Sequence, residues 1–268
     1  MASIKCKMES GIQLLARLSK KTGIERFYPI IFESGPKLGD FIEIYGEGST
    51  TCLLGDLICE CLIPNDLNGP EASIIVFNTD GKLTLDYLIN LSKIKLSKRL
   101  KNSTNKPCHD SKVINSLLNL MLKNLFILDI YNTTQFYTSI QNLEFFLTKY
   151  SNVSLCIFDT LTAFYWDEQN LQKATKMDSY VKKLLRIVQK IVKDFKITVL
   201  YSRPEYFSTS KESIENLEPC YENSESEQIN YRIQIVYNEK DVNLVNVRTY
   251  NKQFQKKFHI FNDEIVWL

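Results

Sequence analysis

The chain has 268 residues, of which 44% are hydrophobic and 24% charged, and this balance excludes a disordered or fibrous protein. Its 33 basic and 31 acidic residues leave a net charge of +2, which excludes a nucleic-acid binder that works through overall positive charge. The seven cysteines form no CxxC pair, and neither a secretory leader nor a membrane-spanning run is recognisable. We therefore expect an intracellular protein with reduced thiols and no membrane partner.

Short apolar runs alternate with helical patterns over the first 201 residues. Five runs predict strands, at residues 41–45, 73–77, 125–130, 153–158 and 196–201. Apolar residues at helical spacing follow in between, within residues 51–63, 83–100, 136–147 and 184–195. Because strands that alternate with helices form parallel pairs, this order predicts an α/β fold with a mostly parallel sheet between two layers of helices.

After residue 230 the pattern changes to short strands alone. Residues 232–237, 242–247, 257–261 and 264–268 predict an antiparallel extension of the sheet, with turns at 238–241 and 262–263. We expect a single domain over residues 1–268. Its parts are an N-terminal helix and lead-in (1–38), a parallel core (39–202), an acidic loop (203–230) and the antiparallel strands (231–268). The lysine-rich residues 93–112 are interpreted as a second mobile loop.

The junction between the first strand and the first long helix is the most informative site. Backbone N–H groups at a helix start can hold phosphate, and Thr51 can supply a hydroxyl for Mg²⁺. The candidate nucleotide-binding residues are Gly46, Glu47, Gly48, Ser49, Thr50 and Thr51. A Walker-type phosphate loop also needs a lysine, yet no Lys or Arg occurs from residue 46 to residue 60. A plain strand-to-helix turn is the alternative interpretation.

Two aspartates follow other predicted strands. Asp159 ends an apolar run, as does the Walker B carboxylate that assists Mg²⁺, and Asp80 follows the second strand, where it could orient an attacking water. They are the candidate catalytic residues, with a turn or helix cap as the alternative for Asp80. Because the carboxyl ends of parallel strands meet at one edge of a sheet, we expect these groups to lie near the phosphate loop.

Four segments resemble RecA-type recombinase paralogues of the X-ray repair cross-complementing type. They are ESGIQLLARL (9–18), GDFIEIYG (39–46), LIP (62–64) and IFDTLTAFYW (157–166). The resemblance implies a RecA-like P-loop ATPase core, a nuclear location and homologous-recombination repair of DNA double-strand breaks in a complex with other recombinase paralogues. By position it matches Gly46, Gly48 and Thr51 to the family's phosphate loop, Asp80 to its acidic residue and Asp159 to its Walker B carboxylate.

The sequence departs from the family pattern at three points. The phosphate loop is two residues shorter and lacks its lysine, the segment 202–227 is acidic where recombinases place a DNA-contacting loop, and the self-assembly pattern Phe-x-x-Ala is absent. The leading hypothesis is a non-hydrolysing subunit that binds a partner paralogue and supports recombinase loading. It would reach single-stranded or branched DNA through the complex. Any ATP and Mg²⁺ would then be held at the interface with the partner.

Two alternative functions stay open. One is an active, DNA-stimulated ATPase with an atypical phosphate loop. The other is direct binding of single-stranded DNA, because basic residues are interleaved with aromatic ones, Tyr250, Phe254 and Phe258. The candidate DNA-binding residues are Lys98, Arg99, Lys101, Arg248, Lys252, Lys256 and Lys257. A solvated basic face over core aromatics is the simpler interpretation of both clusters.

Overall fold

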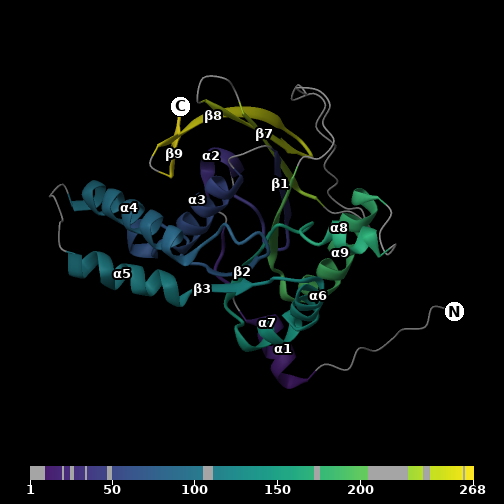
Figure 1. Ribbon diagram of the computed structural model, residues 1–268. Coiled ribbons are helices and arrows are strands. Elements are labelled where there is room, and N and C mark those ends of the chain that lie inside the picture. The colour runs from purple at the N-terminus through teal and green to yellow at the C-terminus, as the bar shows by residue number, and fades with distance from the viewer. Residues whose placement is uncertain are drawn as a thin grey trace.

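The computed structural model describes residues 10–19, 21–24, 27–33, 35–46, 50–104, 111–171, 176–204, 229–237, 242–261 and 263–268. Within them, nine strands form one sheet in the order β3-β2-β4-β5-β1-β6-β7-β8-β9 (Figure 1). The strands are β1 (Phe41–Gly46), β2 (Ser73–Asn78), β3 (Leu125–Asp129), β4 (Val153–Asp159), β5 (Thr198–Arg203), β6 (Tyr231–Tyr237), β7 (Asn243–Thr249), β8 (Gln253–Phe261) and β9 (Glu264–Trp267).

The sheet is parallel from β3 to β6 and antiparallel from β6 to β9. The predicted mixed α/β sheet with a C-terminal antiparallel part is therefore confirmed. One detail differs, because β6 was expected to be the first antiparallel strand but runs parallel to its neighbour β1. The antiparallel extension thus begins at β7. The division of the chain into one domain with the boundaries above stays a prediction.

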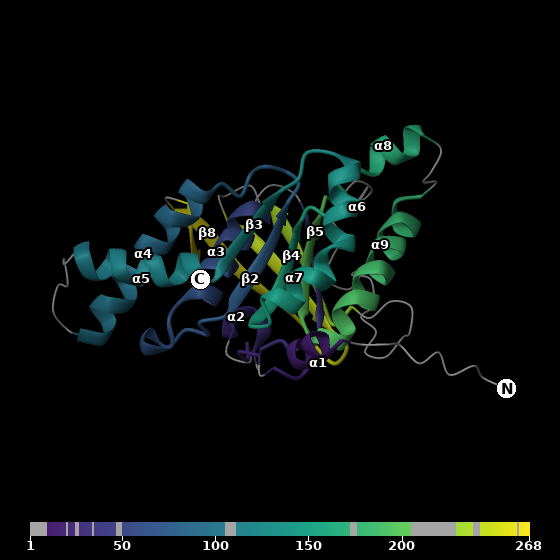
Figure 2. The same ribbon diagram turned by 90° about the horizontal axis from the view of Figure 1, so that it is seen from below.

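Helices cover both faces of the parallel strands (Figures 1 and 2). They are α1 (Gly11–Leu18), α2 (Pro29–Phe32), α3 (Thr50–Leu62), α4 (Leu85–Thr104), α5 (Ser111–Lys123), α6 (Thr133–Gln141), α7 (Leu143–Lys149), α8 (Tyr165–Asn170) and α9 (Met177–Val192), with short 3₁₀ turns at Asn65–Leu67 and Lys193–Phe195. The helix expected in the N-terminal lead-in is α1, which begins at a capping box formed by Ser10 and Gln13.

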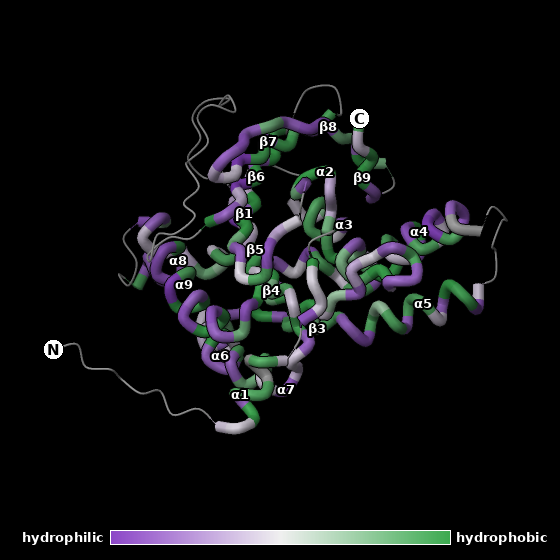
Figure 3. Tube along the Cα trace, turned by 180° about the vertical axis from the view of Figure 1, so that it is seen from behind, coloured by the Kyte–Doolittle hydropathy of each residue, from purple (hydrophilic) through white to green (hydrophobic). Residues whose placement is uncertain are grey.

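Successive side chains of a strand point to opposite faces of the sheet, so the apolar ones pack into two separate cores. In β2, Ile74 and Val76 pack with α3 and α4, whereas Ile75 and Phe77 pack with α6, α7 and α9. The inner face of β7–β9 belongs to the first of these cores, through residues such as Phe258. In Figure 3 hydrophobic colour accordingly marks α3 and β4, while α9 carries much hydrophilic colour toward solvent.

The interpretation of residues 93–112 as a mobile loop is wrong for the part that the structure describes. Residues up to Thr104 continue α4, where Leu96 and Leu100 are buried one turn apart, and Ser111 already begins α5. The many lysines on the outer side of α4 obscured this apolar face. The acidic loop was expected at 203–230, and its residues 205–228, like residues 105–110, lie outside the described residues.

Candidate functional site at the carboxyl edge of the sheet

The parallel strands bring the predicted site residues to one edge of the sheet. Asn78 at the end of β2 lies beside Asp159 at the end of β4, and Tyr45 in β1 lies beside Arg203 in β5. Gly46 ends β1 on this edge and Thr50 begins α3 there. The strand register therefore brings three features to one edge, as expected. They are Asp159, the start of the phosphate-loop segment and the chain after β2.

Asp159 is the buried carboxylate of this edge, with 3% of its surface exposed. Its Oδ1 accepts a hydrogen bond from Ser202 Oγ at 2.6 Å, whereas its buried Oδ2 has no hydrogen-bond partner among the described residues. Burial raises the pKa of Asp159, and the negative charge of Asp80 adds to the rise, while Ser202 and Lys82 oppose it. A carboxylate with a free buried oxygen is a fitting ligand for a cation or a water.

The chain after β2 is fastened to Asp159 through its backbone. The carbonyl oxygen of Asp159 accepts hydrogen bonds from the N–H groups of Thr79, at 2.7 Å, and Asp80, at 3.0 Å. The carboxylate of Asp80 forms an ion pair with Lys82 at 2.5 Å. Asp80 is therefore held near Asp159 as expected, but its charge is paired with a lysine that sequence reasoning did not consider. Its role in orienting a water stays a prediction.

Gly46 has a structural reason to be glycine. Its φ is +138°, and a Cβ built on it would lie 2.1 Å from the carbonyl oxygen of Ile235, its partner in β6. The close approach of β6 therefore accounts for this glycine without a phosphate. Thr50 and Thr51 form the first turn of α3 and are half-buried, whereas Glu47, Gly48 and Ser49 lie outside the described residues. Nucleotide binding by these six residues stays a prediction.

A buried ion cluster lies in β1, the strand that ends at Gly46, and was not foreseen. Glu43 in β1 accepts a hydrogen bond from Arg203 Nε at 2.8 Å and another from Tyr201 Oη at 2.9 Å, and it also pairs with Arg232 of β6. Burial alone would raise the pKa of Glu43, but the two arginines outweigh it and lower that pKa. The Arg203 guanidinium also lies 4.5 Å from the centre of the Tyr45 ring.

The described residues at this edge supply few groups for Mg²⁺ or for the phosphates of ATP. Asp159 offers an oxygen that has no hydrogen-bond partner among the described residues, and Thr51 lies in the first turn of α3. No lysine or arginine occurs between residues 46 and 60 to neutralise the β- and γ-phosphates, and the two cations at this edge, Lys82 and Arg203, are each paired with a carboxylate. Within the described part of the chain, no cluster of three or more His, Cys, Asp or Glu residues could hold a metal.

The first group of candidate DNA-binding residues lies on α4. Lys98 pairs with Glu264 of β9 at 2.6 Å, and Arg99 pairs with Glu60 of α3 at 2.7 Å, while Lys101 is exposed. The pairs tie α4 to β9 and α3, so they give two of the three residues a structural role. DNA binding by this group stays a prediction.

The second group does not share one face of the sheet. The β7–β8 register places Arg248 opposite Gln253, on the side of Lys257, whereas Lys256 alternates to the other side with Phe254. Lys252 pairs with Glu33 at 2.7 Å. Of the aromatic residues beside them, Phe258 is fully buried and Tyr250 is 63% exposed. Only Tyr250 is thus clearly available to stack on a base.

The comparison with known proteins finds a distant relative. No family model matches the chain. The chain is similar to DNA repair protein XRCC2 of Mus musculus, with 23% identity over 197 residues that cover 71% of this chain. The match spans 66% of the mouse protein, slightly less than two thirds of its length. This distant homology to a RecA paralogue confirms the resemblance to the X-ray repair cross-complementing protein 2 type and, with the mixed sheet, the RecA-like fold.

Proposed function

We propose that this chain is a non-hydrolysing subunit of a nuclear recombinase-paralogue complex in homologous-recombination repair of DNA double-strand breaks. It binds a partner paralogue and supports recombinase loading on DNA. The observation that carries the proposal is an intact core with an incomplete phosphate site. The buried carboxylate of Asp159 is kept at the strand edge, while the segment from residue 46 to residue 60 has no basic residue for the phosphates.

An exposed apolar stripe supports a partner contact. Ile12, Leu15 and Leu18 follow one another at three-residue spacing on α1 and are 69%, 69% and 67% exposed. Phe145 of α7, the helix against which α1 packs, is 73% exposed. Water-facing apolar side chains on adjoining helices are typical of a protein interface. The segment 9–18 that forms this stripe is also one of those that resemble the recombinase paralogues.

The partner contact is tested by co-expression with other recombinase paralogues of the same organism. We expect a stable pair with one of them, and we expect Leu15→Asp to abolish co-purification. The matched control is Leu120→Asp, which places the same charge at an exposed leucine of α5. Failure of the wild-type chain to co-purify with any paralogue would contradict the proposal, as would equal loss of binding in both variants.

The absence of hydrolysis is tested on the assembled complex. We expect ATP turnover to be unchanged by Asp159→Ala in this subunit, because a partner's own site performs any hydrolysis. The unpartnered Asp159 Oδ2 is the observation that favours the alternative, an active ATPase with an atypical loop. Turnover by this chain with DNA, lost on Asp159→Ala, would establish that alternative.

The nuclear location is proposed from the resemblance. Among the described residues, no helix combines the length and apolar character needed to cross a bilayer. A fluorescent fusion of the chain is expected to accumulate in the nucleus, and its exclusion from the nucleus would contradict this part of the proposal.

A further inference from the structure

A basic hollow of about 560 Å³ lies at the amino-terminal ends of β1 and β5, at the edge of the sheet opposite to Asp159. Its basic residues come from four segments: the chain before β1, helix α9, the 3₁₀ turn at Lys193–Phe195 and the chain before β5. They are Lys37, Arg186, Lys190, Lys193 and Lys196, all exposed. The acidic residue of the described lining is Asp40. The lining therefore carries a net charge of 5 − 1 = +4, against +2 for the whole chain.

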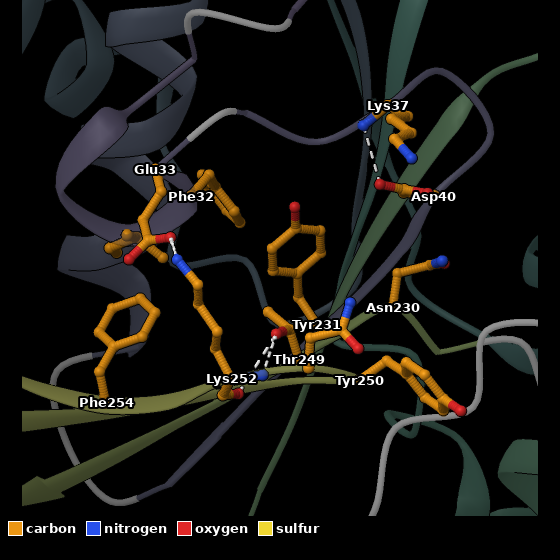
Figure 4. Close-up of a pocket in the computed structure, with 12 residues that line it drawn as sticks. Phe32, Glu33, Lys37, Asp40, Asn230, Tyr231, Thr249, Tyr250, Lys252 and Phe254 are labelled. Carbon is orange, nitrogen blue, oxygen red and sulfur yellow. Dashed lines mark hydrogen bonds and ion pairs between the residues drawn. The ribbon is translucent and has the colours of Figure 1, made fainter.

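The five basic groups have no counter-charge among the described residues, since none of these forms an ion pair with any of them. The carboxylate of Asp40 is 8% exposed and accepts a hydrogen bond from the backbone N–H of Lys37 at 2.8 Å, so it serves the backbone of its own loop (Figure 4). By contrast, Lys95, Lys98 and Lys252 each pair with a glutamate. Like charges gathered without compensation repel one another, so this cluster costs stability unless an anion joins it.

Helix stability accounts for only part of this charge. Cations near the C-terminus of a helix interact favourably with its dipole, which explains Lys190 and Lys193. The effect falls off within the last turn, so it does not explain Arg186, which lies further inside the helix, or Lys37, which comes from another segment. An anionic ligand in the hollow would account for all five charges together.

The segments that carry Lys37 and Lys196 are fixed to one another. Thr198 Oγ1 donates a hydrogen bond to the carbonyl oxygen of Lys37 at 3.0 Å, and the N–H of Val199 donates one to the carbonyl oxygen of Asp40 at 2.9 Å. These bonds join the chain before β1 to the start of β5. The backbone of the hollow is therefore formed before a ligand arrives, which lowers the entropy lost on binding.

The deeper part of the lining is apolar. Phe41, Val192 and Ile197 are buried, and Leu38 is half-buried beside them. Sites for unpaired bases present aromatic rings for stacking, but the aromatic residue of the described lining, Phe41, is only 3% exposed. A basic rim above aliphatic side chains fits a peptide that carries both a phosphate and an aliphatic residue.

We propose that this hollow binds a phosphorylated serine or threonine in a peptide segment of a partner protein. The phosphate carries about −1.5 to −2 charges at pH 7 and three acceptor oxygens, which the basic rim can satisfy. Arg186 offers a fork of N–H donors for two of these oxygens, and Lys37 and Lys190 supply further charge. An aliphatic residue beside the phosphoresidue rests on Leu38. None of the described lining residues belongs to α1 or α7, so the site goes beyond the partner contact proposed above.

The first test is a degenerate peptide library with phosphoserine or phosphothreonine at its centre, immobilised and incubated with the full chain. We expect stronger capture by this library than by the same library without phosphate. We also expect leucine, isoleucine or valine to be enriched beside the phosphoresidue. Equal capture by both libraries would overturn the proposal.

The second test is fluorescence anisotropy with the most enriched phosphopeptide. Removal of its phosphate is expected to weaken binding at least about tenfold, because the charge-assisted hydrogen bonds are lost. R186E/K190E is expected to lose at least about tenfold as well. The matched control is K93E/K101E, which makes the same charge change at exposed lysines of α4 and should lose much less. Equal loss in both variants would show general electrostatic attraction and overturn the proposal, as would no loss in either.

Three competitors assign the class of ligand. They are the same peptide with glutamate in place of the phosphoresidue, inorganic phosphate, and an oligothymidine at equal charge concentration. We expect each to displace the phosphopeptide at least about tenfold less well than the unlabelled phosphopeptide does. Equal displacement by the glutamate peptide would overturn the proposal in favour of an acidic peptide. Equal displacement by phosphate or by oligothymidine would overturn it in favour of a free anion or of a nucleic acid.

Folding and partner binding are checked on the same variants. Thermal unfolding should show R186E/K190E folded, and R186Q/K190Q, which introduces no negative charge, should lose affinity in the same direction but by less. R186E/K190E should still co-purify with the partner paralogue, whereas Leu15→Asp should still bind the phosphopeptide. The failures of the two proposals are therefore distinguishable.

Discussion

Glu43 is the buried charge on which three central strands depend. It lies in β1 with 2% of its surface exposed and compensates Arg203 of β5 and Arg232 of β6, whose side chains are 20% and 6% exposed. Replacement by glutamine keeps the shape of the side chain and removes the negative charge. Both arginines then lose the carboxylate that they share, and Tyr201 keeps only a neutral acceptor.

The expected cost follows from this burial. Removing one member of a buried ion pair costs about 3–5 kcal/mol, because the remaining charge stays away from water without compensation. Glu43→Gln should therefore lower the free energy of unfolding by about 3–5 kcal/mol. For a chain of this size, this amounts to a fall of about 10 °C in the melting temperature.

The assay is urea unfolding followed by circular dichroism, with Glu264→Gln as the matched control. Glu264 pairs with Lys98, which is 57% exposed, and pairs of this kind contribute about 0–1 kcal/mol. A loss of stability in Glu43→Gln no larger than that of the control would refute the reasoning.

The pH dependence of stability gives a second check on Glu43. Because the folded-state pKa of Glu43 is lowered, its contribution is present above the ordinary value of 4.5 and is lost as pH falls through the folded-state pKa. The difference between wild type and Glu43→Gln should therefore shrink in acid.

Three further substitutions test other features. Gly46→Ala should cost more than about 2 kcal/mol in urea unfolding, because of its positive φ and the approach of Ile235, and a neutral result would contradict the close pairing of β1 with β6. Asp159→Asn should change the free energy of unfolding by less than about 1 kcal/mol, since burial already disfavours the charged form. Burial lowers the pKa of Lys21 from 10.5 to about 8, so the unfolded chain binds the extra proton between these values. Wild type should accordingly gain stability relative to Lys21→Met as pH rises from about 8 to 10, and a constant difference would contradict this.

The apolar strands were the most predictable part of the fold. Runs such as the one that ends at Asp159 are buried on both sides, so composition alone identified them and placed their carboxyl ends at one edge. Helix α5 was missed although Ile114, Leu117, Leu118 and Met121 recur at helical spacing, because this apolar run continues almost directly into β3. Contacts between distant polar residues were beyond prediction, since nothing local in the sequence pairs Glu43 with Arg203.

The lysine-rich part of α4 is a second case in which contacts between distant residues could not be predicted from the sequence. Its charge density is typical of a solvated loop, but Lys95 is buried and forms ion pairs with Asp56 at 2.8 Å and with Glu60 at 2.7 Å. These partners lie on α3, more than thirty residues away in the chain. A lysine that is paired across two helices cannot be distinguished from a solvated one by composition.

The contact of Trp267 with Tyr28 also has a consequence for biosynthesis. Tyr28 donates a hydrogen bond to Asp56 and accepts one from Trp267 Nε1 at 2.9 Å, across a separation of 239 residues. At about 5–20 residues per second, a ribosome needs roughly 10–50 s to make the intervening chain. During this interval the ring of Tyr28 lacks the edge-on packing of Trp267. The layer around α3 is therefore exposed to chaperones, or to aggregation, until β9 emerges and covers it.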